Sequence, residues 1–438
     1  WAPAFDTCEI DASASHIACT ATDQKSGLKL VQTLSMDPHS DTVTLQTKLT
    51  NTGDTPLNVS QLAAGALPLP STAHTVESLS GRHNNEFQPN TDILTRAGWH
   101  RENRRGLTSH DGAPLAGVLG PGATQSSGPV WAAQLAWSGN HTQSIDWLDD
   151  GRRIWMAGEW FAPGEITLAP GETLSSPQWL ATFSPHGRDG VAQNFHTALR
   201  SQSPLTKNRS LQPRPVHINT WEGFYFNHTE TELMALADAA AVLGIERFVL
   251  DDGWFVGRHD DTSALGDWVA DPVKYPNGLG PLATHVHDLG MQFGLWVEPE
   301  MINPNSTLFR QHPDWVLHLG SSARLTARNQ LVLDLARVEV RDYLFNALDR
   351  LLSELPISYL KWDHNRELTE AGHAGQPAYH GQTHGVYDLI DRVSRHHPDV
   401  EIETCAGGGG RIDAGILKRT HRVWASDCID AVSRHQIQ

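Results

Sequence analysis

After residue 215, seven apolar stretches alternate with amphipathic helical patterns. Strands that alternate with helices form parallel sheets, so this alternation strongly limits the fold of the second half of the chain. Helices are expected near 229–243, 278–289, 384–396 and 411–419, with another long helix ending near 354. The expected strands are Val216–Trp221, Arg247–Trp254, Gln292–Pro299, Leu331–Leu335, Ile357–Asp363, Val400–Ala406 and Arg422–Asp427.

Seven strands are one short of a (β/α)8 TIM barrel. Because the chain stops about eleven residues after the seventh strand, we expect the eighth unit to lie beyond residue 438. An open doubly wound sheet is the alternative, and it carries a glycine-rich phosphate turn after its first strand. No such turn follows Val216–Trp221. The predicted fold is therefore a TIM barrel truncated after about seven strands.

The first 190 residues show a different pattern, which is typical of an antiparallel β-sandwich. Short alternating stretches such as Thr42–Leu49 and Trp131–Trp137 are separated by turn signals rich in Gly, Asn and Pro. A helical stretch near 190–202 and a proline-bearing link at 212–215 follow. We therefore predict a β-sandwich domain over 1–190, a helical linker over 191–213 and a barrel over 214–438, with the sandwich incomplete at its start and the barrel at its end.

Charge and composition limit the partners. The formal net charge of −17 argues against nucleic acid and anionic membrane, and favours a neutral or cationic small molecule. Fifteen Trp against six Tyr suits stacking on sugar rings. The 24 His contain no HExxH motif, and the four Cys have no CxxC spacing.

One expected strand ends in Lys361-Trp362-Asp363 and a later one ends in Asp427. Because strand side chains alternate, Lys361 and Asp363 share one face. Charged groups at the carboxyl end of an inward-facing strand are poor core material but suit an active site. Two aspartates on neighbouring strands can act as nucleophile and acid/base, which is the arrangement of a retaining glycosidase.

Carboxylates and tryptophans also dominate the other strand ends, where they suit hydrogen bonds to hydroxyls and stacking on sugars. The stretch Cys405–Arg411 follows a strand and opens a helix, as in a phosphate cradle, but lacks the Lys-Ser/Thr of a P-loop. We favour backbone N–H groups that bind a sugar hydroxyl. The remaining strand ends are Trp221-Glu222, Asp251–Trp254, Trp296–Glu300 and Trp424.

Several of these strings together resemble family 36 glycoside hydrolases, the α-galactosidases of the bacterial type. The resemblance covers nearly the whole chain. Departures from the family pattern include His364 after Lys-Trp-Asp and Cys428-Ile429 after Ser-Asp. The matching strings are Arg214–Glu222, Leu250–Phe255, Leu265–Trp268, Leu360–Arg366, Cys405–Arg411 and Trp424–Asp427.

The resemblance implies a β-sandwich, a catalytic (β/α)8 barrel and a C-terminal β domain. It assigns Asp363 as the nucleophile and Asp427 as the acid/base. It also implies a homo-tetramer for the full-length protein, and we expect a cytoplasmic location. The sugar-binding positions implied by the resemblance are Trp221, Asp251, Asp252, Trp296, Arg328, Lys361, Cys405, Gly408 and Trp424.

The predicted activity is hydrolysis of terminal α-galactosides such as melibiose or raffinose with retention of configuration. No metal or organic cofactor is expected, because acid and nucleophile are both side chains. An α-N-acetylgalactosaminidase with the same two aspartates is the nearest alternative, and a sugar-binding barrel without activity is another. A metal-dependent barrel hydrolase would need clustered His ligands at the strand ends, and these ends lack His.

Overall fold

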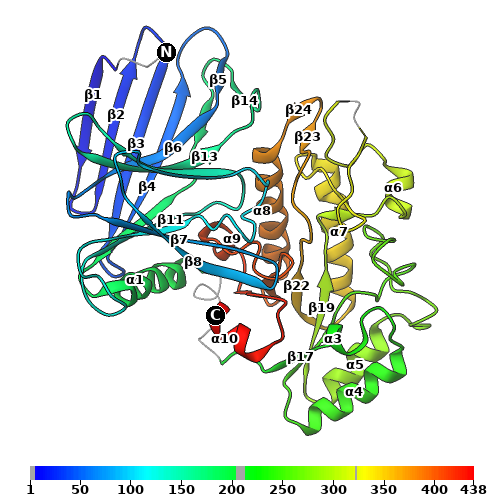
Figure 1. Ribbon diagram of the computed structural model, residues 1–438. Coiled ribbons are helices and arrows are strands. Elements are labelled where there is room, and N and C mark those ends of the chain that lie inside the picture. The colour runs from blue at the N-terminus through cyan, green and yellow to red at the C-terminus, as the bar shows by residue number, and fades with distance from the viewer. Residues whose placement is uncertain (1–4, 204–212, 321–322) are drawn as a thin grey trace. The chain divides into compact units, whose positions relative to one another are not determined.

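A computed structural model describes residues 5–203, 213–320 and 323–438, which form two compact units (Figure 1). The first unit contains the residues up to Ser203 together with Gly410–Lys418 and Cys428–Gln438. The second unit contains the described residues of Pro204–Gly409 and Arg419–Asp427. Within the described ranges, no helix combines the length and the apolar character needed to cross a membrane.

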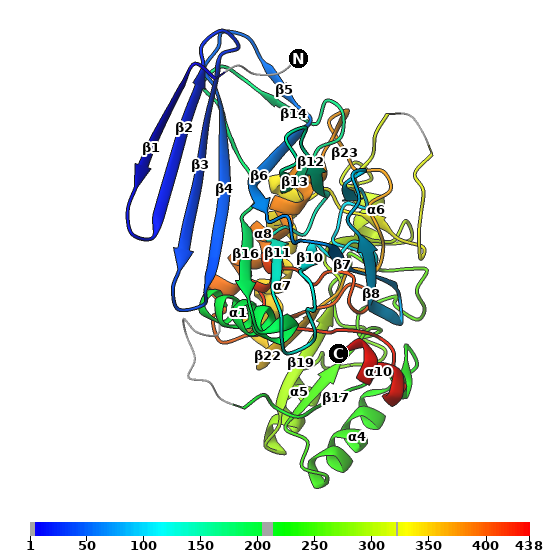
Figure 2. The same cartoon turned by 60° about the vertical axis from the view of Figure 1, so that its left-hand side comes forward.

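The first unit is built on a large antiparallel sheet with the strand order β1-β2-β3-β4-β16-β11-β10-β7-β8, in which β15 also pairs with β4. The first four strands follow one another as hairpins and lie side by side in Figures 1 and 2. Its strands are β1 (Thr7–Ala12), β2 (His16–Asp23), β3 (Leu28–Asp37), β4 (Thr42–Asn51), β7 (Thr75–Arg82), β8 (Asn85–Ile93), β10 (Leu115–Leu119), β11 (Val130–Leu135), β15 (Thr173–Ser175) and β16 (Trp179–Ser184).

Turn residues fix the tight hairpin between β2 and β3. The backbone N–H of Ser26 donates to Oδ1 of Asp23 at 3.0 Å, and Gly27 adopts a φ of 64°. A Cβ atom at Gly27 would lie 2.5 Å from the Cα of Gly53 in the turn that follows β4. Glycine is therefore required at position 27 by both conformation and space.

A second antiparallel sheet, with the order β6-β13-β12-β9, packs face to face on the first. The buried rings of Trp155 and Trp179 meet edge to face, with centroids 5.6 Å apart, and Oγ1 of Thr47 donates to the carbonyl of Ala64 at 3.0 Å. The predicted β-sandwich is therefore confirmed. The strands are β6 (Gln61–Leu69), β9 (Trp99–Asn103), β12 (His141–Trp147) and β13 (Arg153–Trp160), with a separate pair of β5 (Leu57–Val59) and β14 (Ile166–Leu168).

Helix α1 (Gly187–Gln202) covers β11 and β16, where Val191 and Phe195 pack against Val130 and Leu180. The short helices α9 (Ala414–Leu417) and α10 (Ala431–Ile437) complete the unit, and Asp430 caps α10 by accepting from Ser433. The expected helix near 190–202 is present. The division into these three predicted segments remains a prediction, and residues 204–212 of the predicted linker lie outside the described residues.

The second unit contains a sheet of six parallel strands in the described residues. Its spatial order follows the chain order, as in a barrel, whereas a doubly wound sheet reverses direction at a switch point. This order confirms the predicted fold class as part of a barrel. The strands are β17 (His217–Asn219), β18 (Arg247–Leu250), β19 (Gln292–Val297), β22 (Ile357–Trp362), β25 (Glu401–Thr404) and β26 (Arg422–Val423).

Amphipathic helices between the strands supply the apolar partners of this sheet. Thr229 and Glu232 form a capping box at the start of α4, and the buried faces of α7 and α8 contact each other. Figure 1 shows α4 beside α5 and α7 beside α8. The helices are α3 (Trp221–Phe224), α4 (Glu230–Val242), α5 (Gly280–Asp288), α6 (Thr307–Gln311), α7 (Val338–Glu354) and α8 (Tyr379–His396).

The prediction of a barrel strand at Leu331–Leu335 is wrong. Within Leu331–Leu335, β21 (Leu331–Val332) pairs antiparallel with β20 (Met301–Ile302), outside the parallel sheet. These residues are buried, which explains the apolar pattern, but they lie in the connection between β19 and α7. The parallel sheet therefore has six described strands, not seven. Another short pair, β23 (Gly372–His373) with β24 (Gln376–Pro377), lies before α8.

Candidate active site

A buried ion pair lies at the carboxyl ends of the parallel strands. Nζ of Lys361 donates to Oδ2 of Asp251 at 2.9 Å, although β19 separates their strands in the sheet. Asn219 also donates to this oxygen at 2.5 Å, and the backbone N–H of Asp252 donates to Oδ1 at 2.9 Å. Burial lowers the pKa of Lys361, but the charges of Asp251 and nearby acidic groups outweigh burial and raise it well above its usual value. Lys361 is therefore held as a cation.

Asp363, the residue directly after β22, is 7% exposed and accepts hydrogen bonds at both carboxylate oxygens. Trp296 and Asn365 donate to Oδ2 at 3.1 and 2.7 Å from their side chains, whereas the backbone N–H groups of His364 and Gly407 donate to Oδ1 at 2.8 and 3.3 Å. These donors orient both carboxylate oxygens.

The charge state of Asp363 follows from this environment. Burial raises its pKa, but the charge of Lys361 and hydrogen bonds that include those from Asn365 and the Cys405 thiol outweigh burial. The net pKa of Asp363 therefore lies below its ordinary value. An ionised, oriented carboxylate at the end of a barrel strand is suited to nucleophilic attack.

The guanidinium of Arg258 and one backbone N–H bind the carboxylate of Asp252. Arg258 donates from Nε to Oδ1 at 3.0 Å and from Nη2 to Oδ2 at 2.7 Å, and the Gly253 N–H donates to Oδ1 at 2.7 Å. Burial raises the pKa of Asp252, although the guanidinium of Arg258 acts in the opposite direction. The bidentate contact fixes the plane of the Asp252 carboxylate.

Cys405 lies at the end of β25, and its backbone N–H donates to the carbonyl of Trp362 at 2.8 Å. Burial, followed by the charge of Asp363, raises the pKa of the Cys405 thiol well above its usual value. The thiol is therefore neutral and can donate a hydrogen bond. Gly408 follows in a turn with a φ of 81°. The carbonyl of Gly408 accepts from the Ala406 N–H at 2.9 Å.

Trp424 connects the second predicted catalytic aspartate to this group. Its indole Nε1 donates to Oδ1 of Asp427 at 2.8 Å, and Nζ of Lys361 lies 5.9 Å from the Trp424 ring centroid. The Trp424 side chain therefore contacts Asp427 and lies near Lys361. The two carboxyl groups of a retaining glycosidase lie roughly 5–6 Å apart, and we predict this spacing for Asp363 and Asp427.

The remaining predicted residues lie at the margin of this cluster. Arg328, with a φ of 51°, donates to Oδ1 of Asn365 at 2.7 Å and thus touches Asp363 indirectly. Trp221 begins α3 directly after β17, where its ring packs edge-on against Tyr225 and Phe226 with centroid distances of 5.1 Å to each. The structure thus connects Arg328 to the carboxylates through Asn365 and places Trp221 against neighbouring aromatic rings.

Several residues of the site were missed from the sequence. Asn365 lies two residues after Asp363, so the alternation that grouped Lys361 with Asp363 also indicates Asn365. Glu298 accepts from the Asn365 N–H at 2.7 Å and from Gln330 at 3.1 Å. Burial, with the charge of Asp363 second, raises the pKa of Glu298 to about 8.

Glu300 contacts two residues at the carboxyl end of β22. It accepts from Nε1 of Trp362 at 2.9 Å, and Nδ1 of His364 lies 2.8 Å from its other oxygen. The sequence pattern indicates carboxylates at the Trp296–Glu300 strand end, but no sequence signal indicates which side chains they contact.

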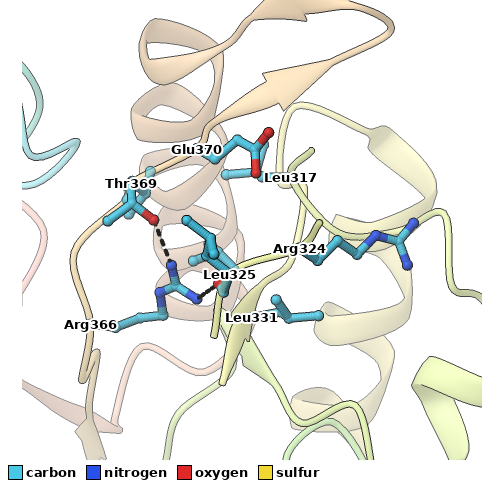
Figure 3. Close-up of a pocket in the computed structure, with 9 residues that line it drawn as sticks. Leu317, Arg324, Leu325, Leu331, Arg366, Thr369 and Glu370 are labelled. Atoms are coloured by element: carbon cyan, nitrogen blue, oxygen red, sulfur yellow. Dashed lines mark hydrogen bonds between the residues drawn. The ribbon is translucent and has the colours of Figure 1, made fainter. Parts of the chain in front are cut away.

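Beside the site, Arg366 supports a small cavity of about 10 Å³ (Figure 3). Its guanidinium donates to the carbonyl of Leu325 at 3.0 Å and to Thr369 at 3.1 Å. This volume holds about one water molecule, so the cavity is too small for a sugar ring. It is lined by Leu317, Arg324, Leu325, Leu331, Val332, Arg366, Leu368, Thr369 and Glu370.

Comparison with known families gives the affiliation of the chain. The melibiase family model matches residues 173–438, and the model of the glycosyl hydrolase family 36 N-terminal domain matches residues 3–169. This chain belongs to glycosyl hydrolase family 36. The N-terminal domain model covers most strands of the sandwich, and the melibiase model covers β15, β16, α1 and the partial barrel of this family 36 chain.

Relatives of this family 36 chain include characterised and solved proteins. It is 46% identical over 436 residues to the alpha-galactosidase of Escherichia coli, covering 100% of this chain and 61% of that protein. The crystal structure of alpha-galactosidase AgaA from Geobacillus stearothermophilus matches with a TM-score of 0.92 and 34% identity, covering 99% of this chain and 64% of the other. The chain thus spans less than two thirds of either relative.

Proposed function

We propose that the protein containing this chain hydrolyses terminal α-galactosides by a retaining double displacement. The observation that carries the proposal is the environment of Asp363. This buried carboxylate has a lowered pKa and accepts hydrogen bonds at both oxygens. A nucleophile must be ionised and oriented before the substrate arrives, and these contacts supply both conditions.

In the proposed mechanism, Asp363 attacks the anomeric carbon from the face opposite the departing oxygen. A covalent galactosyl ester forms with Asp363 as Asp427 gives a proton to the leaving oxygen. Asp427 then removes a proton from water, which attacks the same carbon and releases galactose with its original configuration. The Trp424 indole, which donates to Oδ1 of Asp427, orients this second carboxyl group.

Galactose selectivity is assigned to the aspartates after β18. Asp251 and Asp252 are held by Lys361 and Arg258 respectively, so their oxygens occupy fixed positions. Acceptors at fixed positions bind the axial 4-hydroxyl and the 6-hydroxyl of galactose. An epimer with an equatorial 4-hydroxyl would leave a buried polar group unpaired, which costs about 1–3 kcal/mol of binding free energy. The other proposed sugar-binding residues are Trp221, Trp296, Arg328, Lys361, Cys405, Gly408 and Trp424.

Relatives support the substrate class. Variants of AgaA from Geobacillus stearothermophilus were crystallised in complex with stachyose and with raffinose. We therefore propose raffinose-type oligosaccharides as substrates of the full-length protein. Its assembly as a homo-oligomer and its cytoplasmic location remain predictions.

The nearest second candidate, an α-N-acetylgalactosaminidase, differs at the 2-substituent. The neutral Cys405 thiol beside the Gly407–Gly408 turn suits a plain 2-hydroxyl more than a bulky acetamido group. Side-by-side assays of the full-length protein on nitrophenyl α-galactoside and its N-acetylgalactosaminide test this choice. We expect kcat/KM to be at least about 100-fold higher for the galactoside, corresponding to about 2.8 kcal/mol. Equal or reversed values would contradict the proposal.

A further inference from the structure

Two cysteines of the sandwich lie side by side, far along the sequence from the carboxylate site. Cys8 on β1 and Cys19 on β2 have their Sγ atoms 3.1 Å apart. We propose that Cys8 and Cys19 form a reversible cross-strand disulfide when the protein meets a small-molecule disulfide oxidant. This inference does not depend on the proposed hydrolase activity.

The strand register places both thiols on one face of the sheet. Cys8 lies opposite Ala21 and Cys19 lies opposite Ile10, so the two cysteines are diagonal neighbours of an antiparallel pair. A disulfide bond is about 2.05 Å long, so the sulfurs must approach by about 1 Å. In the described part of the chain, β1 pairs with β2 alone, so a small shift of β1 breaks no second ladder.

Exposure decides which thiol reacts first. Cys8 is exposed and Cys19 is half-buried, so an oxidant reaches Cys8 more readily. The hydrogen bond to Cys8, followed by burial, raises the pKa of Cys19, so Cys19 keeps its proton longer. The other two cysteines are distant in sequence from Cys8 and Cys19. They are the buried Cys405 and the half-buried Cys428.

Formation of the disulfide requires two exchange steps, in which oxidised glutathione is the oxidant. The Cys8 thiolate attacks one sulfur of oxidised glutathione, which forms a mixed disulfide and releases one reduced glutathione. The Cys19 thiol then loses its proton and attacks Sγ of Cys8, which forms the Cys8–Cys19 bond and releases the second reduced glutathione. Two protein thiols are oxidised, and one glutathione disulfide is reduced to two thiols.

Peptide mapping of the full-length protein tests the proposal. After incubation with oxidised glutathione and blocking of remaining thiols, a protease that cuts after glutamate separates the two cysteines at Glu9. We expect the two fragments to stay joined, with a mass 2 Da below the sum of the reduced fragments, and to separate after reduction. Cys8→Ser and Cys19→Ser should each abolish the joined species and leave one glutathione adduct.

The result that overturns the proposal is also direct. If the wild-type protein carries separate glutathione or blocking-reagent adducts on Cys8 and Cys19, with no joined fragments, the two thiols do not form the disulfide. A bond from either residue to Cys405 or Cys428 would equally contradict it. The wild-type measurement alone decides the question, so a poorly folded variant does not affect the outcome.

Discussion

Asn365 binds Asp363 through its side chain, with Nδ2 2.7 Å from Oδ2, which is shorter than the contacts from Trp296, His364 and Gly407 to that carboxylate. The backbone N–H of the same residue donates to Glu298 at 2.7 Å, and its side-chain oxygen accepts from Arg328 at 2.7 Å. Asn365 is therefore fixed at three points and cannot turn away from Asp363 without breaking other contacts.

Asn365→Ala should impair the ionised state of Asp363. A hydrogen bond to a charged group contributes about 1.5–3 kcal/mol, so we expect kcat/KM to fall about 10- to 100-fold. Because Asn365 lowers the pKa of Asp363, the acidic limb of the pH–rate profile should move to higher pH. A loss of rate without that movement would contradict the role of Asn365 in holding the charge.

Glu298→Gln tests the buried carboxyl next to Asn365. Its folded-state pKa of about 8 lies above the ordinary 4.5, so folding takes up a proton between these values. The contribution of the wild-type group to stability is complete below about pH 4.5 and is lost as the pH rises to about 8. The variant lacks this titration, so its thermal midpoint should fall less than that of the wild type between pH 5 and pH 8. Parallel midpoint curves would contradict the raised pKa.

Lys361→Met should leave Asp251 buried without its cation. Removing one partner of a buried pair destabilises a protein by about 3–5 kcal/mol. The double variant Lys361→Met with Asp251→Asn removes both charges, so it should regain part of that loss in denaturant unfolding while staying inactive. Additive losses in the double variant would show that the two charges are not coupled.

Arg247→Met provides a matched control at the opposite end of the strands. Arg247 begins β18, is 1% exposed, and donates to Glu401 at 2.9 Å and to Gln292 at 2.7 Å. Its loss should lower the stability by less than the about 3–5 kcal/mol expected for Lys361→Met, because Glu401 keeps a second cationic partner in Arg214. The kcat and KM of the folded protein should remain unchanged. An altered kcat would contradict the restriction of the chemistry to the carboxyl ends.

The sequence was informative wherever a local pattern determined the geometry. Alternation along β22 predicted that Lys361 and Asp363 share a face, and the strand–helix alternation predicted the partial barrel. It failed at Leu331–Leu335, because burial of a connecting segment produces the same apolar pattern as burial of a barrel strand. The contacts of Glu298 and Arg258 depend on loops that meet only in the folded chain, so no spacing signal reveals them.

Azide rescue of the two aspartate variants tests the roles of Asp363 and Asp427 most directly. In the full-length protein, Asp427→Ala acting on an aryl α-galactoside should still form the Asp363 ester, and azide should attack it to give α-galactosyl azide. Asp363→Gly forms no ester, so azide should attack the substrate itself and give the β-azide. If the Asp363 variant instead gave the α-azide and the Asp427 variant the β-azide, the proposed roles would be contradicted.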